Sequence, residues 1–129
     1  MSVLGIGIDL VEVARIGRLL ERHGERAVAR ICNAGEADLG RVALDQHLAG
    51  LFAAKEAVLK ALGTGWAQGT AFRQVEVVRA PGGAPGVRLH DVAAARAAAM
   101  GVTRIHLSIT HERGFAAAMA VLEGGGDVR

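Results

Sequence analysis

The chain has 129 residues, of which 51% are hydrophobic and 22% are charged, and its formal net charge is +2. This composition fits one domain with a modest core, and the mild charge and the scarcity of aromatic side chains argue against nucleic-acid binding. The single cysteine, Cys32, excludes an internal disulfide, and no apolar run is long enough to span a membrane, so we expect a cytoplasmic protein.

The N-terminal segment alternates between large apolar residues and glycine, which predicts a strand over residues 3–8. Gly5, Gly7 and Asp9 share one face of this strand, and the glycines would let another backbone or a ligand approach closely. Asp9 closes that face at the end of the strand. It either supplies a carboxylate to a metal site or caps the helix predicted over residues 11–23.

Helical segments follow, and the first of them carries a basic surface. The helix at 11–23 has an apolar stripe and, roughly opposite it, three arginines: Arg15, Arg18 and Arg22. A less regular helical stretch is expected over residues 25–39, with a break near residues 33–35. A long helix is expected over residues 42–62, and it ends at the turn Gly63-Thr64-Gly65.

The C-terminal half is typical of strands around one short helix. Strands are predicted over residues 73–79, 87–89, 103–111 and 115–122, and a helix capped by Asp91 runs to Gly101. Alternate alanines of the last strand are expected to offer a flat surface on which copies of the chain pack closely: Ala116, Ala118 and Ala120. Residues 124–129 are expected to be a frayed tail. Because neither a repeat nor a linker interrupts the chain, residues 1–129 are expected to form a single α+β domain.

The long helix holds a dense group of ionisable residues. Lys55 and Lys60 are the only lysines among 15 basic residues, which reflects either a general arginine bias or a need for compact ammonium groups. Glu56 and Lys60 are four residues apart and share one face, as an ordinary helix ion pair or as the edge of a site. Lys55 falls inside the apolar stripe, where its long stem can reach past apolar neighbours. Three ionisable groups next to the buried side of a helix favour a site.

Three further features are candidates for the same site. The turn Gly63-Thr64-Gly65 either stops the helix or exposes backbone N–H groups that bind phosphate oxygens. Asp9 and a carboxylate from another element can together hold one Mg²⁺ that keeps its waters and takes a substrate phosphate. His111 ends an apolar strand face, either as a structural histidine or as a functional ring at the rim of the core.

Three segments together resemble the holo-acyl-carrier-protein synthases, the short phosphopantetheinyl transferases: GIGIDLVEVARI at residues 5–16, FAAKEAVLKALGTG at residues 52–65 and HLSITHERGFAAAMAV at residues 106–121. The resemblance implies a phosphopantetheinyl transferase fold of the α+β class, in which a small antiparallel sheet packs with a long helix. It implies a homotrimer with active sites at the subunit interfaces. It also implies coenzyme A and Mg²⁺ as ligands, an apo acyl carrier protein as partner and 3′,5′-ADP as product.

The resemblance gives each candidate residue a role. Asp9 and Glu56 would be metal ligands, and Lys60 would contact the reacting phosphate, so these three are the catalytic candidates. Coenzyme A would be bound by Lys55, Lys60, Gly63, Thr64, Gly65 and His111, and the carrier protein by Arg15, Arg18 and Arg22. Such a transfer needs positive charge near the phosphorus, which Mg²⁺ and a lysine supply. The base for the attacking serine would be Glu56 or a metal-bound water.

The chain departs from the family pattern in two places. Leu51 stands where the family usually has arginine, so a phosphate contact to coenzyme A is missing or comes from elsewhere. The stretch around Cys32 and its link to His47 also match poorly, near the expected coenzyme A and carrier surfaces. The alternative is a specialised or non-catalytic relative that binds a carrier protein on the same scaffold. The combination of Asp9, Glu56 and Lys60 argues against the non-catalytic relative, because a binding module needs no metal pair.

Overall fold

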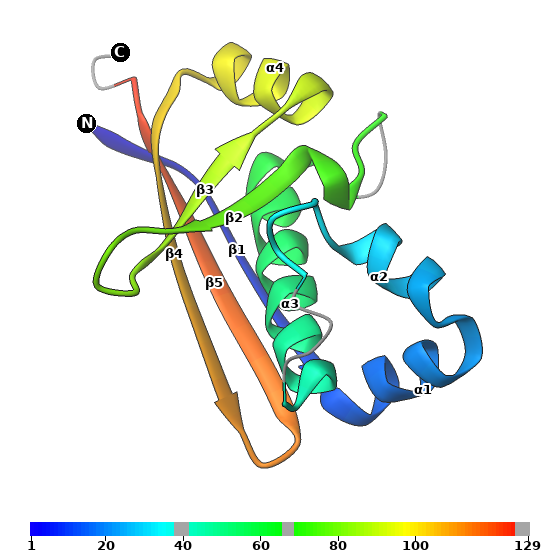
Figure 1. Ribbon diagram of the computed structural model, residues 1–129. Helices are drawn as coiled ribbons and strands as arrows, with labels where there is room; N and C mark the ends of the chain where they lie inside the picture. The colour runs from blue at the N-terminus through cyan, green and yellow to red at the C-terminus, as the bar shows by residue number, and fades with distance from the viewer. Residues whose placement is uncertain (38–41, 66–68, 126–129) are drawn as a thin grey trace.

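A computed structural model describes residues 1–37, 42–65 and 69–125 (Figure 1). Its strands are β1 (Ser2–Glu12), β2 (Val75–Arg79), β3 (Pro85–Leu89), β4 (Val102–Glu112) and β5 (Phe115–Gly124). Its helices are α1 (Val13–His23), α2 (Glu25–Ile31), α3 (Leu44–Leu62) and α4 (Asp91–Met100), with a short 3₁₀ turn, η1 (Phe72–Gln74). Within these ranges, none of the helices combines the length and the apolar character needed to cross a membrane.

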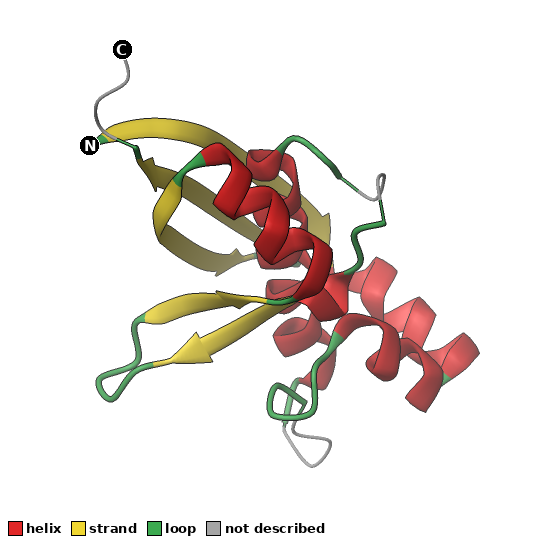
Figure 2. Cartoon of the chain, turned by 90° about the horizontal axis from the view of Figure 1, so that it is seen from above, coloured by secondary structure: helices red, strands yellow, loops and turns green. Residues whose placement is uncertain are grey.

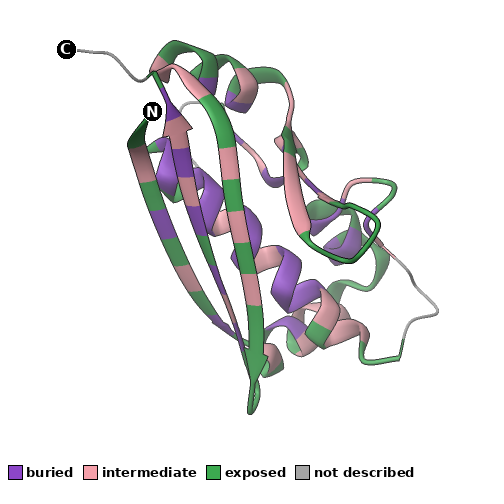
Figure 3. Ribbon diagram, turned by 90° about the vertical axis from the view of Figure 1, so that its left-hand side faces the viewer, coloured by how far each residue is buried: buried purple, intermediate pink, exposed green. Residues whose placement is uncertain are grey.

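The long helix α3 is the central element of the fold. Three long strands form an antiparallel sheet in the order β1-β5-β4, and α3 packs along one face of it (Figures 1 and 3). The strands β2 and β3 form a separate antiparallel hairpin beside this sheet (Figure 2). Helices α1 and α2 lie on the other side of α3 (Figure 1). This arrangement confirms the predicted α+β fold, with a small antiparallel sheet packed against a long helix.

Small residues let α3 lie directly on the backbone of the sheet. Gly7 of β1 faces α3, and a Cβ atom added there would overlap the carbonyl oxygen of Ala57. The same relation holds for Gly5 and Ala61, about one helical turn further along. The close approach predicted at the glycine face is therefore made by another backbone, that of α3. We call Gly5 and Gly7 the glycine seat of this helix.

The opposite face of the sheet is apolar and open. Large side chains remain exposed on it: Ile6, Ile8, Leu10, Phe115 and Met119. We call these five residues the open sheet face. The three alternate alanines of β5 point the other way and are at most 4% exposed: Ala116, Ala118 and Ala120. The prediction that these alanines offer a packing surface for association is therefore wrong, because the alternation of β5 directs them at α3.

The first strand is longer than predicted, which changes the position of Asp9. Residues of β1 pair with β5 as far as Glu12, so α1 begins at Val13 rather than at residue 11. Glu12 occupies the N-cap position of α1. Asp9 lies three residues earlier, within the strand, so the alternative that it caps the helix is wrong.

Other boundaries shift by one or two residues. Helix α3 begins at Leu44 rather than at residue 42. Asp91 is the first residue of α4, and His90 takes the N-cap position that was predicted for Asp91. Gly124 still belongs to β5, whereas residues 126–129 of the predicted frayed tail lie outside the described ranges.

Candidate active site

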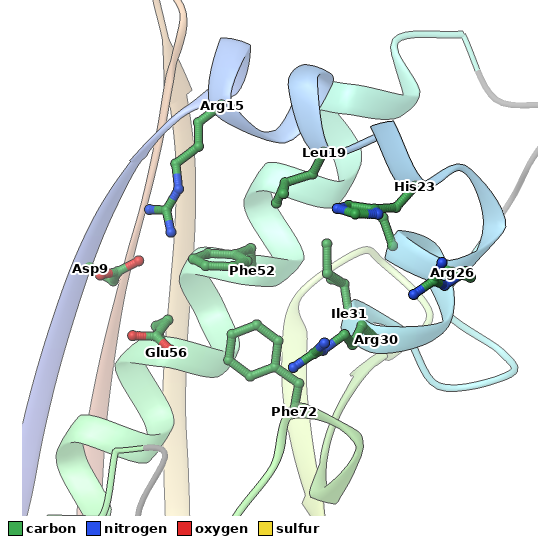
Figure 4. A pocket seen from close by; sticks show the side chains of 11 residues that line it. Asp9, Arg15, Leu19, His23, Arg26, Arg30, Ile31, Phe52, Glu56 and Phe72 are labelled. Carbon is green, nitrogen blue, oxygen red and sulfur yellow. The ribbon is translucent and has the colours of Figure 1, made fainter. Parts of the chain in front are cut away.

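A cavity of about 490 Å³ opens between β1, α1, α2 and α3 (Figure 4). Its floor is apolar and includes the rings of Phe52 and Phe72. Its rim carries two carboxylates and several basic side chains: Asp9, Glu56, Arg15, Arg26 and Arg30. We call it the carboxylate cavity.

The two carboxylates predicted as metal ligands come together here from different elements. The register places Asp9 on the α3-facing side of β1, opposite Ala118, and Figure 4 shows Asp9 and Glu56 side by side with Arg15 directed toward them. Among the described residues no cluster of three or more His, Cys, Asp or Glu side chains forms a cation site. Mg²⁺ needs only one or two protein carboxylates when waters and a substrate phosphate complete its shell. The pair therefore fits this ion.

Lys60 connects the helix to the same carboxylates. Its ammonium donates to Asp9 Oδ1 at 3.0 Å and to the carbonyl oxygen of Ile8 at 3.1 Å. The Lys60 side chain is 49% exposed, whereas that of Asp9 is 14% exposed. Lys60 of α3 thus bonds to β1. These two bonds use only two of its three ammonium protons. A compact positive charge lies at the edge of the carboxylate cavity.

Arg15 lies over an aromatic floor. Its guanidinium carbon is 5.3 Å from the centre of the Phe52 ring, which is a cation–π distance. Phe52 packs edge-on against Phe72, with ring centres 5.0 Å apart at an interplanar angle of 88°. Because Phe72 belongs to η1, the aromatic pair joins α3 to the segment before β2. Arg15 therefore combines an exposed charge with an apolar surface beneath it.

Sequence reasoning found only part of this basic rim. Arg26 and Arg30 of α2 also line the cavity, and neither was predicted as a site residue. Their spacing of four places them on one helix face, while Ala27 and Ile31 are buried. Helical periodicity over residues 25–31 therefore held the signal for both arginines.

The other predicted carrier-binding arginines lie outside the cavity. Arg18 is 3.9 Å from Glu12, and both side chains are more than half exposed. Arg22 is also exposed, near the end of α1. The structure therefore separates Arg15, at the rim of the cavity, from an outer basic surface formed by Arg18 and Arg22.

His111 lies in a second cavity, of about 670 Å³, between α3, the β2–β3 hairpin and β4. Its Nε2 atom is 3.2 Å from the carbonyl oxygen of Gln46, and its ring packs over Gly50. Leu51, at the position where arginine was expected, also lines this histidine cavity. His111 is on β4 and Asp9 is on β1, the two edge strands of the sheet, with β5 between them. Within the described residues, one chain thus presents two separate cavities, with the carboxylates in one and His111 in the other.

The glycine turn after α3 acts as a helix stop. The N–H groups of Gly63, Thr64 and Gly65 all donate to carbonyl oxygens of the last turn of α3. Gly63 has a left-handed backbone with φ of 80°, as expected at the end of a helix. The expectation that these N–H groups are exposed for phosphate oxygens does not fit this geometry, because the helix C-terminus already uses them.

Lys55 is buried, and this changes its predicted role. Its side chain is 0% exposed, and its ammonium donates to Glu36 Oε1 at 2.6 Å, Asn33 Oδ1 at 2.9 Å and the carbonyl oxygen of Phe72 at 3.3 Å. These bonds use all three protons, so the predicted direct contact of Lys55 with coenzyme A does not fit the structure. Burial lowers the pKa of the Lys55 ammonium, and the bond to Glu36 opposes this shift.

Comparison with known proteins identifies the family to which this fold belongs. The model of the 4′-phosphopantetheinyl transferase superfamily matches residues 5–120. The chain belongs to this superfamily. A holo-[acyl-carrier-protein] synthase of Solidesulfovibrio magneticus is 51% identical over 123 residues, which cover 95% of this chain and 99% of that protein.

Solved structures of holo-[acyl-carrier-protein] synthases also have the fold of this chain. The holo-[acyl-carrier-protein] synthase of Neisseria meningitidis superposes with a TM-score of 0.85 at 31% identity, over 95% of this chain and 99% of that one. The synthase of Bacillus anthracis, in complex with CoA (3′,5′-ADP), superposes with a TM-score of 0.77 at 35% identity, over 95% and 98%. The predicted family, fold and enzyme class are confirmed.

Two residues of this phosphopantetheinyl transferase were missed because they lie in the stretch that matches the family poorly. Asn33 and Glu36 hold the Lys55 ammonium, and Glu36 is itself buried. The sequence offered one indirect signal, a lysine inside an apolar stripe, because a buried ammonium needs a buried partner. Burial, aided by the Glu36 charge, also raises the pKa of the neighbouring Cys32 thiol to about 11, so this cysteine stays protonated.

Proposed function

We propose that the protein moves the 4′-phosphopantetheine group from coenzyme A to a serine of an apo acyl carrier protein, with Mg²⁺ as cofactor and 3′,5′-ADP as leaving product. The serine oxygen forms a bond to the phosphorus that carries pantetheine. The bond from this phosphorus to the ADP oxygen breaks, and the serine proton passes to a base. The observation that carries the proposal is the convergence of Asp9 and Glu56 on one cavity, with Lys60 bonded to Asp9.

Each group has a task that its position allows. Mg²⁺ held by Asp9 and Glu56 supplies charge neutralisation at the transferring phosphate. The Lys60 ammonium brings a second positive charge and a movable proton to the leaving side. The Phe52–Phe72 floor offers apolar contact to the pantetheine arm. The basic rim attracts an acidic carrier surface and contributes to the rate of encounter more than to affinity.

Mass spectrometry of the carrier tests the proposal. An apo acyl carrier protein incubated with this chain, coenzyme A and Mg²⁺ should gain the mass of one phosphopantetheine, and EDTA should stop the gain. A carrier that binds the chain but stays unmodified would instead favour the non-catalytic relative.

We also propose that the protein works as a homotrimer in the cytoplasm. The carboxylate and histidine cavities lie toward opposite edges of the sheet, and association through the open sheet face would bring the carboxylate cavity of one copy next to the histidine cavity of another. The apolar side chains of that face have no other cover within the described chain.

Sedimentation should give a particle of about three times the chain mass of 13.3 kDa. The change Ile8→Glu puts a charge in the middle of the open sheet face and should give monomers with little transfer activity. Ile8 is 65% exposed in the single chain, so the charge is tolerated by the folded monomer. Val92→Glu, on the exposed part of α4, should leave the trimer intact. A stable, fully active monomer would contradict an interface site.

The change Lys60→Arg should lower kcat by about tenfold to a hundredfold. A guanidinium keeps the charge, but it is planar, longer and a poor proton donor. Its donors lie in one plane and farther along the side chain, so the bonds that the ammonium makes to Asp9 and Ile8 would have to form in a different geometry. Steady-state transfer and circular dichroism would measure the effect. If kcat stays normal, Lys60 serves only as a structural link between α3 and β1.

A further inference from the structure

Lys55 and Glu36 are the only buried charged side chains among the residues that the structure describes. Their side chains are 0% and 2% exposed, and the nitrogen–oxygen distance is 2.6 Å. Such a pair is a weak source of net stability, because both ions lose their water, and apolar residues of equal size often do as well. The pair also has no part in the transfer step described above. Its position suggests what else it does.

Glu36 joins three segments that are far apart in the sequence. Its Oε1 atom accepts hydrogen bonds from the Lys55 ammonium and from the N–H group of Asn33, both at 2.6 Å. Its Oε2 atom accepts from the N–H group of Val77, also at 2.6 Å. One carboxylate therefore ties the segment that follows α2 to both α3 and β2, and all of these bonds need its two acceptor oxygens.

The hydrogen bonds of Glu36 and Lys55 lie between the carboxylate cavity and the histidine cavity. Glu36 and Val77 line the histidine cavity, together with His111. Phe72, whose carbonyl oxygen accepts the third bond of Lys55, lines the carboxylate cavity on the other side. The ion pair thus holds one wall of each cavity against the same helix.

We propose that Glu36 is a positioning residue for coenzyme A: by tying Val77 and its own segment to Lys55, it sets the shape of the histidine cavity. The proposal rests on the proposed function and on the expectation, from the family resemblance, that His111 belongs to the coenzyme A site. Glu36 acts through the backbone it holds and needs no contact with the reacting phosphate.

The direction of the change in coenzyme A affinity distinguishes a positioning role of Glu36 from a simple effect of its charge. Coenzyme A is a polyanion, so loss of a carboxylate from the cavity wall should by charge alone tighten its binding. The amide of Glu36→Gln has one acceptor oxygen, so it keeps either the bond from Val77 or the bonds from Lys55 and Asn33, and the bridge between α3 and β2 breaks in both cases. We expect the dissociation constant for coenzyme A, and its KM, to rise about tenfold, with a smaller change in kcat. Partial unfolding would instead lower kcat at constant KM.

Glu76→Gln is the matched control. Glu76 lines the same cavity, but its partners are surface side chains, His90 at 2.9 Å and Arg88 at 3.6 Å. This variant loses the same charge, but the backbone pairing of β2 with β3 remains and no bond to α3 or to the segment after α2 is broken, so coenzyme A should bind to it as well as to wild type, or more tightly. If Glu36→Gln also binds with wild-type affinity or more tightly, the positioning role is overturned.

Titration calorimetry of coenzyme A into the intact protein measures these affinities. Hydrogen exchange over residues 75–79 measures how firmly β2 is held by the bond from Val77 to Glu36. Exchange there should be faster in Glu36→Gln. A wild-type protein that does not bind coenzyme A overturns the proposed function and this inference together. Normal binding by both proteins overturns the inference alone. If Glu36→Gln does not fold, the double variant Glu36→Gln/Lys55→Met leaves no unpaired buried charge. The same weakening is expected there, and wild-type affinity in it would overturn the proposal.

Discussion

Glu56→Gln and Asp9→Asn are each expected to lower carrier modification at least about a hundredfold at ordinary Mg²⁺, because each keeps the side-chain shape but removes one of two carboxylates that fit the ion. A hundredfold loss is about 2.7 kcal/mol of transition-state stabilisation, which is within the range of a metal contact. Excess Mg²⁺ should restore part of the activity, since the remaining carboxylate still binds the ion weakly.

Initial rates over a range of Mg²⁺ concentrations measure this effect, with circular dichroism to verify the fold. Glu112→Gln is a suitable control, because the Glu112 side chain is 81% exposed at the end of β4 and does not line the carboxylate cavity. Its rate and its Mg²⁺ dependence should match wild type. Near-normal turnover of Glu56→Gln or Asp9→Asn at ordinary Mg²⁺ would show that the residue concerned is not a metal ligand.

Gly7→Ala is expected to cost about 3 kcal/mol of folding stability, because the added methyl group overlaps a backbone carbonyl oxygen of α3. A flexible side chain could move aside, but the Ala57 carbonyl belongs to the middle of the helix and can only shift with it. Thermal unfolding should show a Tm lower by roughly 10 °C for a chain of this size.

The same substitution at Gly17 should have the opposite sign. Gly17 lies inside α1, and the nearest atom to an added Cβ is a carboxylate oxygen of Asp45 at 3.9 Å. Gly17→Ala should therefore raise stability by about 0.5–1 kcal/mol through helix propensity. If Gly7→Ala melts at the wild-type temperature, α3 does not lie on the backbone of β1 as described.

Local patterns carried the prediction of most elements. The alternation over residues 3–8 and the periodicities of the first and the long helix are properties of neighbouring residues, so β1, α1 and α3 were found. The length of β1 was not predicted, because its last residues are held by pairing with β5, a contact between the two ends of the chain. The outward face of β5 was assigned wrongly for a related reason, since only the position of α3 decides which face is covered.

The site residues also fall into those that the sequence predicted and those that depend on distant contacts. Asp9 and Glu56 were expected to meet because two carboxylates from different elements can hold one Mg²⁺ and the segments that contain them resemble one family, and the structure brings both to one cavity. Glu36 was missed because its three bonds reach Asn33, Lys55 and Val77, up to 41 residues away. The separation of His111 from Asp9 depends on strand order, which a linear sequence does not display.

Lys55 and Glu56 are consecutive on α3, so they project about 100° apart around the helix axis. The buried Lys55 is anchored to Glu36, and the glycine seat fixes how closely α3 approaches β1. The bond between Lys55 and Glu36 and the glycine seat together set the direction, around the helix axis, in which the Glu56 side chain points. At a side-chain radius of about 5–6 Å, a turn of roughly 10° about the axis would swing the carboxylate by about 1 Å, a displacement that can cost about a hundredfold in rate. The direction in which the Glu56 carboxylate points is thus set by residues on other sides of the helix.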